Sequence, residues 1–550
     1  MPPIRKNCRI SGQTFEISEL EQELLQKLHA PEPDTHPNER LRYLMAFRNT
    51  HTLYNDKCDL CGKYTMSMWG ENPIFPVYCK ECWFSDKWQP VQRNLDLNRS
   101  FFDQFQELVN LSPHPARSVN DPMENSDYCN AAGWMKNCYM TFNAANCENV
   151  YYSYGVNKIN NSIDVVMTDE AEYIYHSISC HKSFQVFYSE FAINCRDSYF
   201  LYDCIDCSDC ALSTNLRHKQ FVFMNQQLTE AEYRAKTAEL KSGSYAVMQK
   251  YLAQFAEMKK QAIKKYMIGT RNQDVTGNII FGSKNLVNSY TIQNCEDCAN
   301  LVDMWDTKDS LDMMAFGLGA ELCYSCASVG LKANNLKYVW NSFDNVFNQE
   351  YCAFALSSNN VFGCAFGRKM EYRILNKPYP KEEYKHVIKE IREKMIKNGE
   401  YGHMFRHDML PFAYNECIAG LQMPLTREQA ERLGFRWAEK KVPQVPAHLI
   451  FTPPDSILGV EWQHVDGKVI LCQKTKRPFK ITKPEFDFYK QFNLPLPRVH
   501  PEERLVDQYP SDMIFNLHTA QCSNCGIKIQ TSMPEGDRTF CDACYQKTVQ

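Results

Sequence analysis

Paired cysteine motifs near both ends of the chain constrain its fold more than any other feature. They lie in "CDLCGKYTMSMWGENPIFPVYCKEC" and in "CSNCGIKIQTSMPEGDRTFCDAC". Thiolates three residues apart bind one ion from a tight turn, and four complete the tetrahedron that zinc prefers. We therefore predict about two zinc ions per chain, in small zinc-ribbon or treble-clef modules. The predicted ligands are Cys58, Cys61, Cys79, Cys82, Cys522, Cys525, Cys541 and Cys544. Because closed four-cysteine sites have no open position, their expected role is structural.

The two cysteine sets belong to a longer duplication. A shift of 464 residues aligns residues 8–41 with residues 472–505, and it also aligns the first cysteine pair of each set. We interpret this as one module that occurs at both ends of the chain. Each copy begins with an unpaired cysteine and has a His-Pro further along. Candidate ligands of a second metal site are Cys8, His36, Cys472 and His500. The favoured interpretation is instead a packed cysteine and a histidine that caps a helix or makes a hydrogen bond, since two ligands are too few for structural zinc.

The central region has the pattern of short strands. Aromatic and β-branched runs alternate with Asn, Asp, Cys and Ser, and Asn-Cys recurs, as at Asn137-Cys138 and Asn194-Cys195. Small residues that recur beside each strand are typical of a parallel β-solenoid (a β-helix), in which equivalent residues of successive coils stack. We expect coils of about 20 to 22 residues, with a β-sandwich as the alternative fold. Further C-x2-C spacings, in "CIDCSDC" and at Cys295/Cys298 and Cys323/Cys326, could bind metal. The stacking of small residues predicts the same spacing without metal, and we favour that interpretation.

The strand-rich region is itself duplicated, since a shift of 151 residues aligns "LRHKQF" and its helix with "GRKMEY" and its helix. The predicted fold class is therefore mixed and β-rich: a duplicated central β-solenoid with bracing helices, over about 229–267 and 380–398, between two homologous four-cysteine modules. The predicted segments are a zinc module (1–90), a helical connector (91–128), β-repeat half 1 (129–226), a helical insertion (227–272), β-repeat half 2 (273–376), a helix (377–398), a linker (399–471) and a second zinc module (472–550).

Composition excludes several classes of function. The formal charge of −4 is unusual for a general polyanion binder, and no run of 18 apolar residues predicts a membrane span. The first residues lack the apolar segment of a secretory signal. With 25 cysteines and no export signal, we expect a reducing, cytoplasmic compartment, or a place in a virion.

No enzyme motif of the common nucleophile, phosphate-loop, metalloprotease or dinucleotide types occurs in the chain. We therefore expect a non-enzymatic, zinc-binding scaffold or architectural protein that acts through protein contacts or self-assembly. One alternative is a nucleic-acid- or ribosome-associated zinc protein, which the aromatic residues near Cys82 favour and the near-neutral modules disfavour. The other alternative is a β-helix enzyme that acts on glycans.

Several motifs resemble those of a family of long, cysteine-rich bacterial and viral proteins. They are "RNTHTLYNDKCDLCGK", "FPVYCKECWFSDKW", "FFDQF", "LRHKQF" and "LPLPRVHPEERL". The resemblance covers nearly the whole chain and implies the order zinc module, cysteine-rich repeats, zinc module. It implies no activity, because the family has none assigned. Members often have Cys where this chain has His36, which keeps a second metal site under consideration.

Overall fold

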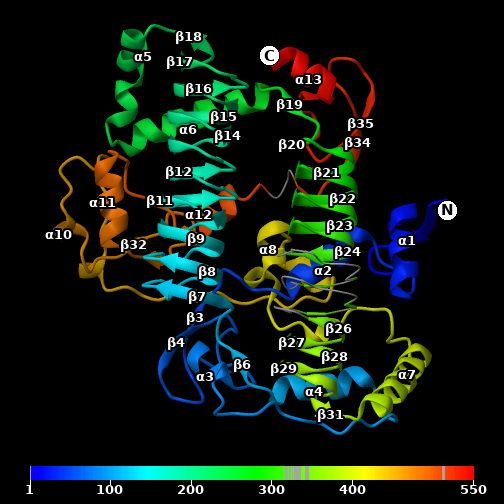
Figure 1. Ribbon diagram of the computed structural model, residues 1–550. Helices are drawn as coiled ribbons and strands as arrows, with labels where there is room; N and C mark the ends of the chain where they lie inside the picture. Colours follow the sequence, from blue (N-terminus) through cyan, green and yellow to red (C-terminus); the bar gives the residue numbers. More distant parts are fainter. Residues whose placement is uncertain are drawn as a thin grey trace.

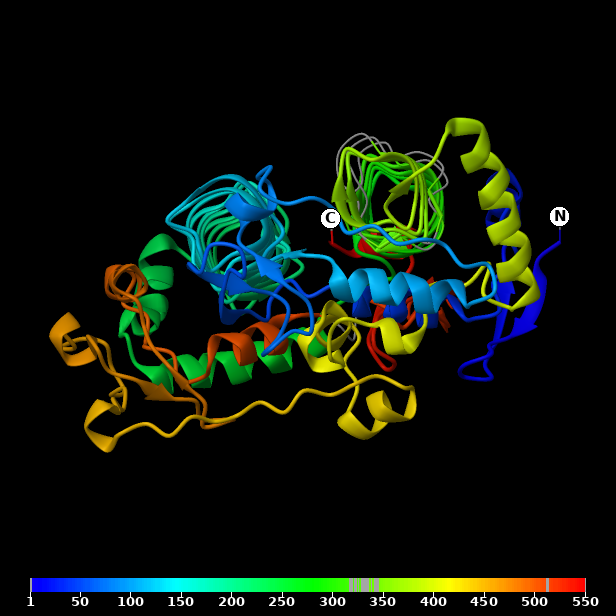
Figure 2. The ribbon, with the colours of Figure 1, turned by 90° about the horizontal axis from the view of Figure 1, so that it is seen from below.

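The computed structural model is mixed and strand-rich, with many helices (Figure 1). It describes residues 2–315, 320, 324, 326, 327, 336, 337, 339, 340, 346–510 and 514–549. Two stacks of strands lie side by side, with helices around them (Figures 1 and 2). Among the described helices, none has the length and apolar character needed to cross a bilayer.

The strands β7 to β17 of the first stack pair in parallel, and from Met123 onwards each paired residue is twelve positions from its partner. Glu148 pairs with Asn160, and Asn160 pairs with Glu172. The strands are β7 (Val119–Glu124), β8 (Asn130–Lys136), β9 (Phe142–Tyr151), β10 (Tyr154–Asn157), β11 (Asn160–Val166), β12 (Glu172–Ile178), β13 (Phe184–Phe187), β14 (Glu190–Ile193), β15 (Arg196–Ile205), β16 (Ser208–Thr214) and β17 (Gln220–Phe223). The short β18 (Gln226–Gln227) ends the stack as an antiparallel neighbour of β17.

The central strands of the second stack have the same twelve-residue step: Lys284 pairs with Glu296, and Glu296 with Lys308. The step is eleven residues from Gln273 to Lys284 and thirteen from Met313 to Cys326. It comprises β20 (Gly269–Thr270), β21 (Gln273–Phe281), β22 (Lys284–Gln293), β23 (Glu296–Trp305), β24 (Lys308–Met314), β25 (Cys326–Ala327), β26 (Phe347–Glu350), β27 (Ala353–Leu356), β28 (Asn359–Phe362), β29 (Ala365–Arg368) and β30 (Glu371–Ile374), with β31 (Lys377–Pro378) antiparallel to β30. In Figure 1, successive strands of the first stack rise from β7 at the bottom to β18 at the top, whereas those of the second stack descend from β20 to β31.

A left-handed backbone corner at every third residue sets the shape of the first stack. From Ala131 to Met224, every third residue has a φ between 47° and 67°. A twelve-residue turn therefore has four corners. Figure 2 shows both stacks end-on, with successive turns superimposed. Asn and Asp adopt this conformation more readily than most residues. In the Asn-Cys pairs the Asn forms the corner, and the Cys after it joins a separate buried cluster that runs from Cys129 to Val222 inside the stack.

The coil length expected from the sequence is wrong, because the paired residues are only twelve apart. The β-sandwich alternative requires antiparallel sheets, whereas β7 to β17 pair in parallel. The β-solenoid itself stays a prediction.

Helices follow each stack. The single helix expected over 229–267 is instead α5 (Glu230–Thr237), a 3-10 turn (Ala238–Lys241) and α6 (Tyr245–Gln261). The chain breaks at Gly243, which has a φ of 68°, and Ser244 then caps α6. After the second stack, α7 (Lys381–Lys397) forms close to its predicted range. It is followed by α8 (Ile418–Gln422), α9 (Arg427–Arg432), α10 (Trp462–Val465) and the 3-10 turns His407–Met409, Tyr414–Glu416 and Ala447–Leu449.

The terminal segments have matching elements. The first contains β1 (Ile4–Asn7), β2 (Thr14–Ile17), α1 (Glu19–Leu28), α2 (Pro37–Ala46), β3 (Tyr54–Lys57), β4 (Tyr64–Ser67), β5 (Val77–Tyr78) and α3 (Lys80–Trp83), before α4 (Phe101–Leu111) and β6 (His114–Pro115). The second contains β32 (Ile470–Leu471), β33 (Pro478–Phe479), α11 (Lys483–Gln491), α12 (Pro501–Gln508), β34 (His518–Gln521), β35 (Lys528–Thr531), β36 (Thr539–Phe540) and α13 (Asp542–Val549). Helices α1 and α11, α2 and α12, and strands β3 and β34 begin at positions related by the shift that aligns the two sequences.

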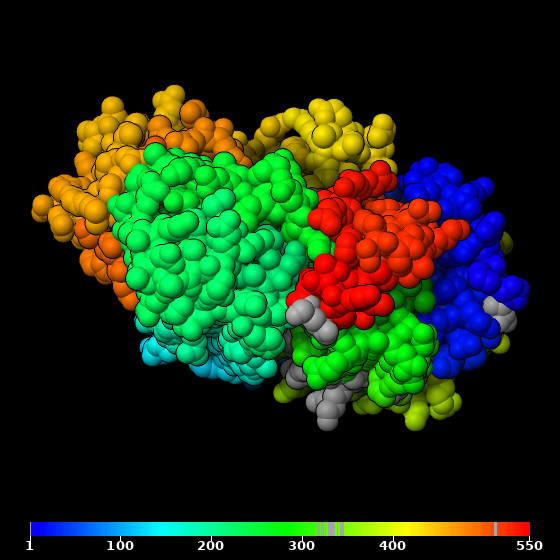
Figure 3. Space-filling model, turned by 90° about the horizontal axis from the view of Figure 1, so that it is seen from above, coloured from blue at the N-terminus to red at the C-terminus, as the bar shows by residue number. Residues whose placement is uncertain are grey.

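The terminal segments pack on the stacks in a crossed arrangement. One buried core joins Leu24 and Leu41 of the N-terminal segment to Leu311 of the second stack. Another joins Tyr489 of the C-terminal segment to Tyr175 of the first stack. Figure 3 shows the C-terminal segment (red) lying between the end of the first stack (green) and the N-terminal segment (blue). The first part of each terminal segment therefore packs on the half of the strand region that is farther from it in sequence.

Candidate metal centres

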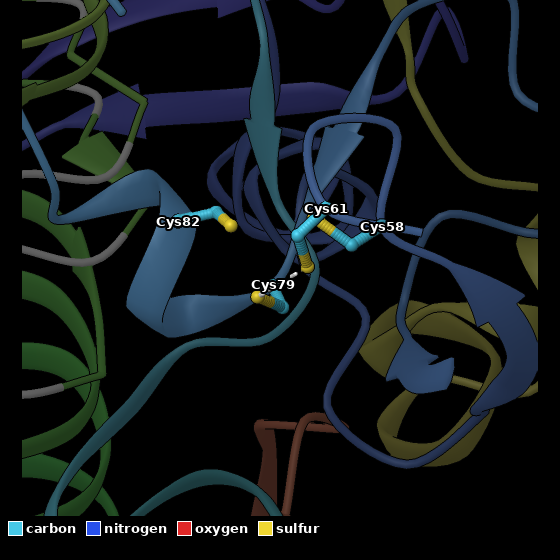
Figure 4. Close-up of side chains that lie close together, drawn as sticks. All are labelled: Cys58, Cys61, Cys79 and Cys82. Atoms are coloured by element: carbon cyan, nitrogen blue, oxygen red, sulfur yellow. Dashed lines mark hydrogen bonds between the residues drawn. The ribbon is translucent and has the colours of Figure 1, made fainter. Parts of the chain in front are cut away.

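The N-terminal cysteine set forms a compact cluster (Figure 4). Strands β3 and β4 form an antiparallel hairpin, and the turn between them is closed by the Gly62 N–H, which donates to the Cys58 carbonyl at 2.8 Å. Gly62 has a φ of 72°, a conformation in which glycine avoids steric cost. The second pair comes from α3, with Cys79 at its N-cap and Cys82 in its turn. The four sulfur atoms lie within 4.8 Å of one another.

The C-terminal set repeats this geometry. Gly526, with a φ of 75°, donates its N–H to the Cys522 carbonyl at 2.9 Å in the turn between β34 and β35. Cys541 and Cys544 come from the start of α13, and all four sulfurs again lie within 4.8 Å of one another.

The sulfur spacing fits a tetrahedral ion. Sulfurs about 2.3 Å from a zinc ion form a tetrahedron with edges of about 3.8 Å. The Cys61 and Cys79 sulfurs are 3.9 Å apart, and those of Cys525 and Cys541 are 3.8 Å apart. All the described cysteines are free thiols. Each cluster could therefore hold one metal ion, as the spacing of the motifs predicts.

Backbone amides favour the thiolate form that a metal requires at one cysteine of each cluster, whereas burial raises the pKa of Cys79 and Cys82. The pKa of Cys61 is lowered to about 7, chiefly by the backbone N–H of Lys63. Burial opposes ionisation of Cys522, but the N–H groups of Cys541, Cys525 and Asn524 outweigh it and lower the pKa of that thiol to about 6. The Cys541 N–H lies 3.3 Å from the Cys522 sulfur.

The candidates for a second metal site occupy a related turn without completing a ligand set. Cys8 and Cys472 begin turns with the same backbone bonds as Cys58, and the His500 N–H points at the Cys472 sulfur from 3.3 Å. His36 and His500 are the N-caps of α2 and α12, and each Nδ1 accepts a backbone N–H two residues ahead. Within the described residues, none of the four joins a group of three or more ligand side chains. The capping alternative accounts for both histidines.

The interior cysteines are placed as small, hydrogen-bonded core residues. The Cys180 sulfur lies 3.5 Å from the carbonyl oxygen of Ile178, and burial raises the pKa of this thiol to about 12. Ser189 makes the equivalent bond to the residue two positions before it, at 2.9 Å. In the described chain, neither the "CIDCSDC" cysteines nor Cys295 and Cys298 form a ligand group, and Cys323 lies outside the described residues.

Each cysteine cluster is fixed to both stacks. Strand β5, beside the N-terminal cluster, pairs in parallel with β6, which leads into the first stack. At the end of the second stack, Arg368 donates to the carbonyls of Phe84 and Ser85 and lies over the Trp83 ring, 5.6 Å from its centre. The N-terminal cluster therefore joins the start of the first stack to the end of the second.

The C-terminal cluster makes the complementary connection. Strand β36 pairs in parallel with β19 (Lys264–Lys265), which leads into the second stack. At the end of the first stack, Arg217 lies over the Tyr545 ring, 5.8 Å from its centre. The contacts of the two clusters are thus related by an approximate two-fold symmetry.

Each half of the molecule also contains a buried ion-pair set that the sequence analysis does not predict. Arg40 donates to Asp312 through Nε at 2.5 Å and to Glu21 at 3.2 Å, and all three side chains are at most 7% exposed. In the other half, the Arg504 Nε lies 3.1 Å from Asp164, and Nη2 lies 4.0 Å from Glu485. The sequence does contain a sign of these ion pairs, because the shift that aligns the two modules also aligns both the arginines and the glutamates.

A scan against protein-family models gave no match, and neither did a search of curated proteins. The geometry alone therefore carries the functional argument.

Proposed function

We propose that the chain is a non-enzymatic scaffold whose two four-cysteine clusters hold zinc and clamp two halves of a duplicated β-solenoid. Its partners are proteins, or further copies of itself, in a reducing compartment such as the cytoplasm. The observation that carries this proposal is the crossed attachment, in which each cluster contacts the start of one stack and the end of the other. This arrangement favours a structural role over a catalytic one, because a four-thiolate site has no open coordination position.

Exposed apolar side chains on the N-terminal module support a protein-binding role. Tyr64 is 81% exposed and Ile74 is 77% exposed. Both lie in the segment that carries the cysteine cluster, whose turn and metal would hold them rigidly. Large apolar residues on a rigid surface are frequent anchors of protein interfaces.

The test is isolation of the full chain from its native cells, with and without nuclease, followed by mass measurement by light scattering. We expect a protein complex or oligomer that survives nuclease. The double variant Tyr64→Ser/Ile74→Ser should lose partners, whereas Ile396→Ser, at a 62% exposed position on α7, should keep them. A chain that runs alone as a monomer contradicts the proposal. A complex that disperses on nuclease treatment favours the nucleic-acid alternative.

A further inference from the structure

A large surface groove lies between the first stack and α11. Its volume is about 770 Å³. One wall comes from β9, β11 and β12 and from the segments that follow β7 and β8, and the other comes from α11 and its N-cap. The lining residues that carry the argument are four asparagines and four tyrosines of the stack. The groove is remote in sequence from both cysteine clusters, and the scaffold proposal does not use it.

The asparagines form a ladder along the groove. Asn125 donates to Asn137 at 3.1 Å, Asn137 to Asn149 at 3.2 Å, and Asn149 to Asn161 at 2.9 Å, always from Nδ2 to Oδ1. Each bond uses one of the two N–H groups of one amide and one lone pair on the oxygen of the next amide. The ladder therefore leaves a row of fixed donors and acceptors, spaced like neighbouring strands at about 4.8 Å.

Tyrosine rings accompany the amides. Tyr128, Tyr139, Tyr151 and Tyr173 line the groove, and the first two rings are 4.9 Å apart. Tyr128 is 42% exposed. Tyr139 and Tyr173 are partly buried, and Tyr151 is only 7% exposed. In the part of the chain that the structure describes, the Tyr128 hydroxyl has no protein hydrogen-bond partner, so it remains available to a ligand. Rings of this kind combine a flat apolar face with a polar tip.

The duplicated half shows that the fold does not require these rings. The positions 148 residues after Tyr128, Tyr139 and Tyr151 are Thr276, Val287 and Ala299. The same shift relates Asp164 to Asp312, which hold equivalent places against the two terminal segments. The second stack therefore makes the same turns without an aromatic row. Tyr151 belongs to the core that holds the C-terminal segment, and the Tyr173 ring lies 5.4 Å from the Phe492 ring, so the exposed Tyr128 is the ring that most needs an explanation other than folding.

The charge of the groove selects among ligands. The residues that line it include Asp127 and Asp487 but no lysine or arginine. A nucleic acid or another polyanion would meet carboxylates without a compensating cation. A row of neutral amides beside flat rings instead matches hydroxyl groups and the C–H faces of sugar rings, whose repeat along a chain is comparable to the spacing of strands. We propose that this groove binds a neutral oligosaccharide, with the tyrosines stacked on sugar rings and the asparagine amides bonded to hydroxyls.

The experiment is calorimetric titration of the full chain with cellohexaose, maltohexaose and chitohexaose, with oligothymidylate as the anionic probe. We expect at least one neutral hexasaccharide to bind, and Tyr128→Ala to weaken that binding at least about fivefold, because it removes one stacking ring. Tyr128→Phe should retain most of the affinity. Phe347→Ala, which removes a ring of nearly the same exposure (43%) from the second stack, is the matched control and should change nothing.

The thermal midpoint of Tyr128→Ala should equal that of the unmodified chain, since the side chain is partly exposed. A second variant, Asn149→Ala, interrupts the ladder and should weaken the same sugar. The proposal is overturned if no neutral hexasaccharide binds at millimolar concentration, if binding is indifferent to both variants, or if oligothymidylate binds in this groove instead.

Discussion

Two buried arginines, at equivalent positions of the two terminal segments, make the same kind of contact in the two halves of the molecule. Arg40 reaches Asp312 and Arg504 reaches Asp164, and each aspartate occupies a left-handed corner of a stack. A glutamate from the same terminal segment lies beside each arginine. A buried charge is costly unless it is paired. These contacts therefore specify where each terminal segment docks, more than they add to net stability.

Arg504→Met should destabilise the protein by about 3 to 5 kcal/mol, because it leaves Asp164 and Glu485 buried without their cation. Urea unfolding followed by circular dichroism measures the change. The control Arg432→Met, at an exposed position on α9, should stay within about 0.5 kcal/mol of the unmodified chain. An Arg504→Met protein as stable as the control would mean that the ion pair does not specify docking.

Asp164 should also make stability depend on pH. Burial raises its pKa to about 7, against about 3.9 in an unfolded chain. The folded state then holds a proton that the unfolded state has lost, so this contribution is complete below about pH 3.9 and disappears as pH rises through about 7. Relative to Asp164→Asn, the unmodified chain should lose about 2 kcal/mol between about pH 5.5 and pH 8. Paired urea titrations measure this difference, and a constant difference would show that the pKa of Asp164 is ordinary.

At the scale of elements, local features were predictable from the sequence and the repeat length was not. The cysteine clusters depend on spacing within one turn and one helix, and their sulfurs do converge. The Asn-Cys pairs correctly marked the stacks. The predicted coil length is wrong because the backbone conformation repeats every three residues. Of these three positions, only the inward one is restricted to small or apolar side chains. Outward positions vary freely and hide the twelve-residue step.

We expect the interior thiols to be unreactive in the native protein, whereas the reactivity of the cluster thiols should depend on bound metal. We expect metal analysis of the purified full chain to give about two zinc ions, and Ellman titration of the native protein to find few reactive thiols. A strong chelator should expose no more than the cluster cysteines, because the thiols inside the stacks are buried. Cys180→Ser should keep both zinc ions, since serine makes the same bond at Ser189, whereas Cys61→Ser should lose one. Rapid reaction of interior thiols in zinc-loaded protein would contradict the placement of these residues.

At the scale of the whole molecule, the crossed docking of the terminal segments explains the position of the two modules. Neither is an isolated appendage, because each contacts both stacks. The region expected as a linker also joins the core: Phe412 stacks on Trp69 with ring centres 5.2 Å apart. These contacts could not be read from the sequence, because they join segments far apart in the chain through shape and packing. The contacts that hold the two stacks together are therefore the ones that the sequence did not predict.

Hydrogen exchange of the zinc-loaded full chain, compared with the Cys61→Ser and Cys525→Ser variants, tests the clamp most directly. Exchange reports local opening, so a lost contact appears as faster exchange in the segments it held. Cys61→Ser should speed exchange in residues 114–124 and 365–376, and Cys525→Ser should speed it in residues 214–223 and 264–281. Each variant should leave the other's pair of segments protected. If exchange rises only inside the mutated module while both stacks stay protected, the modules are independent of the stacks and the clamp does not exist.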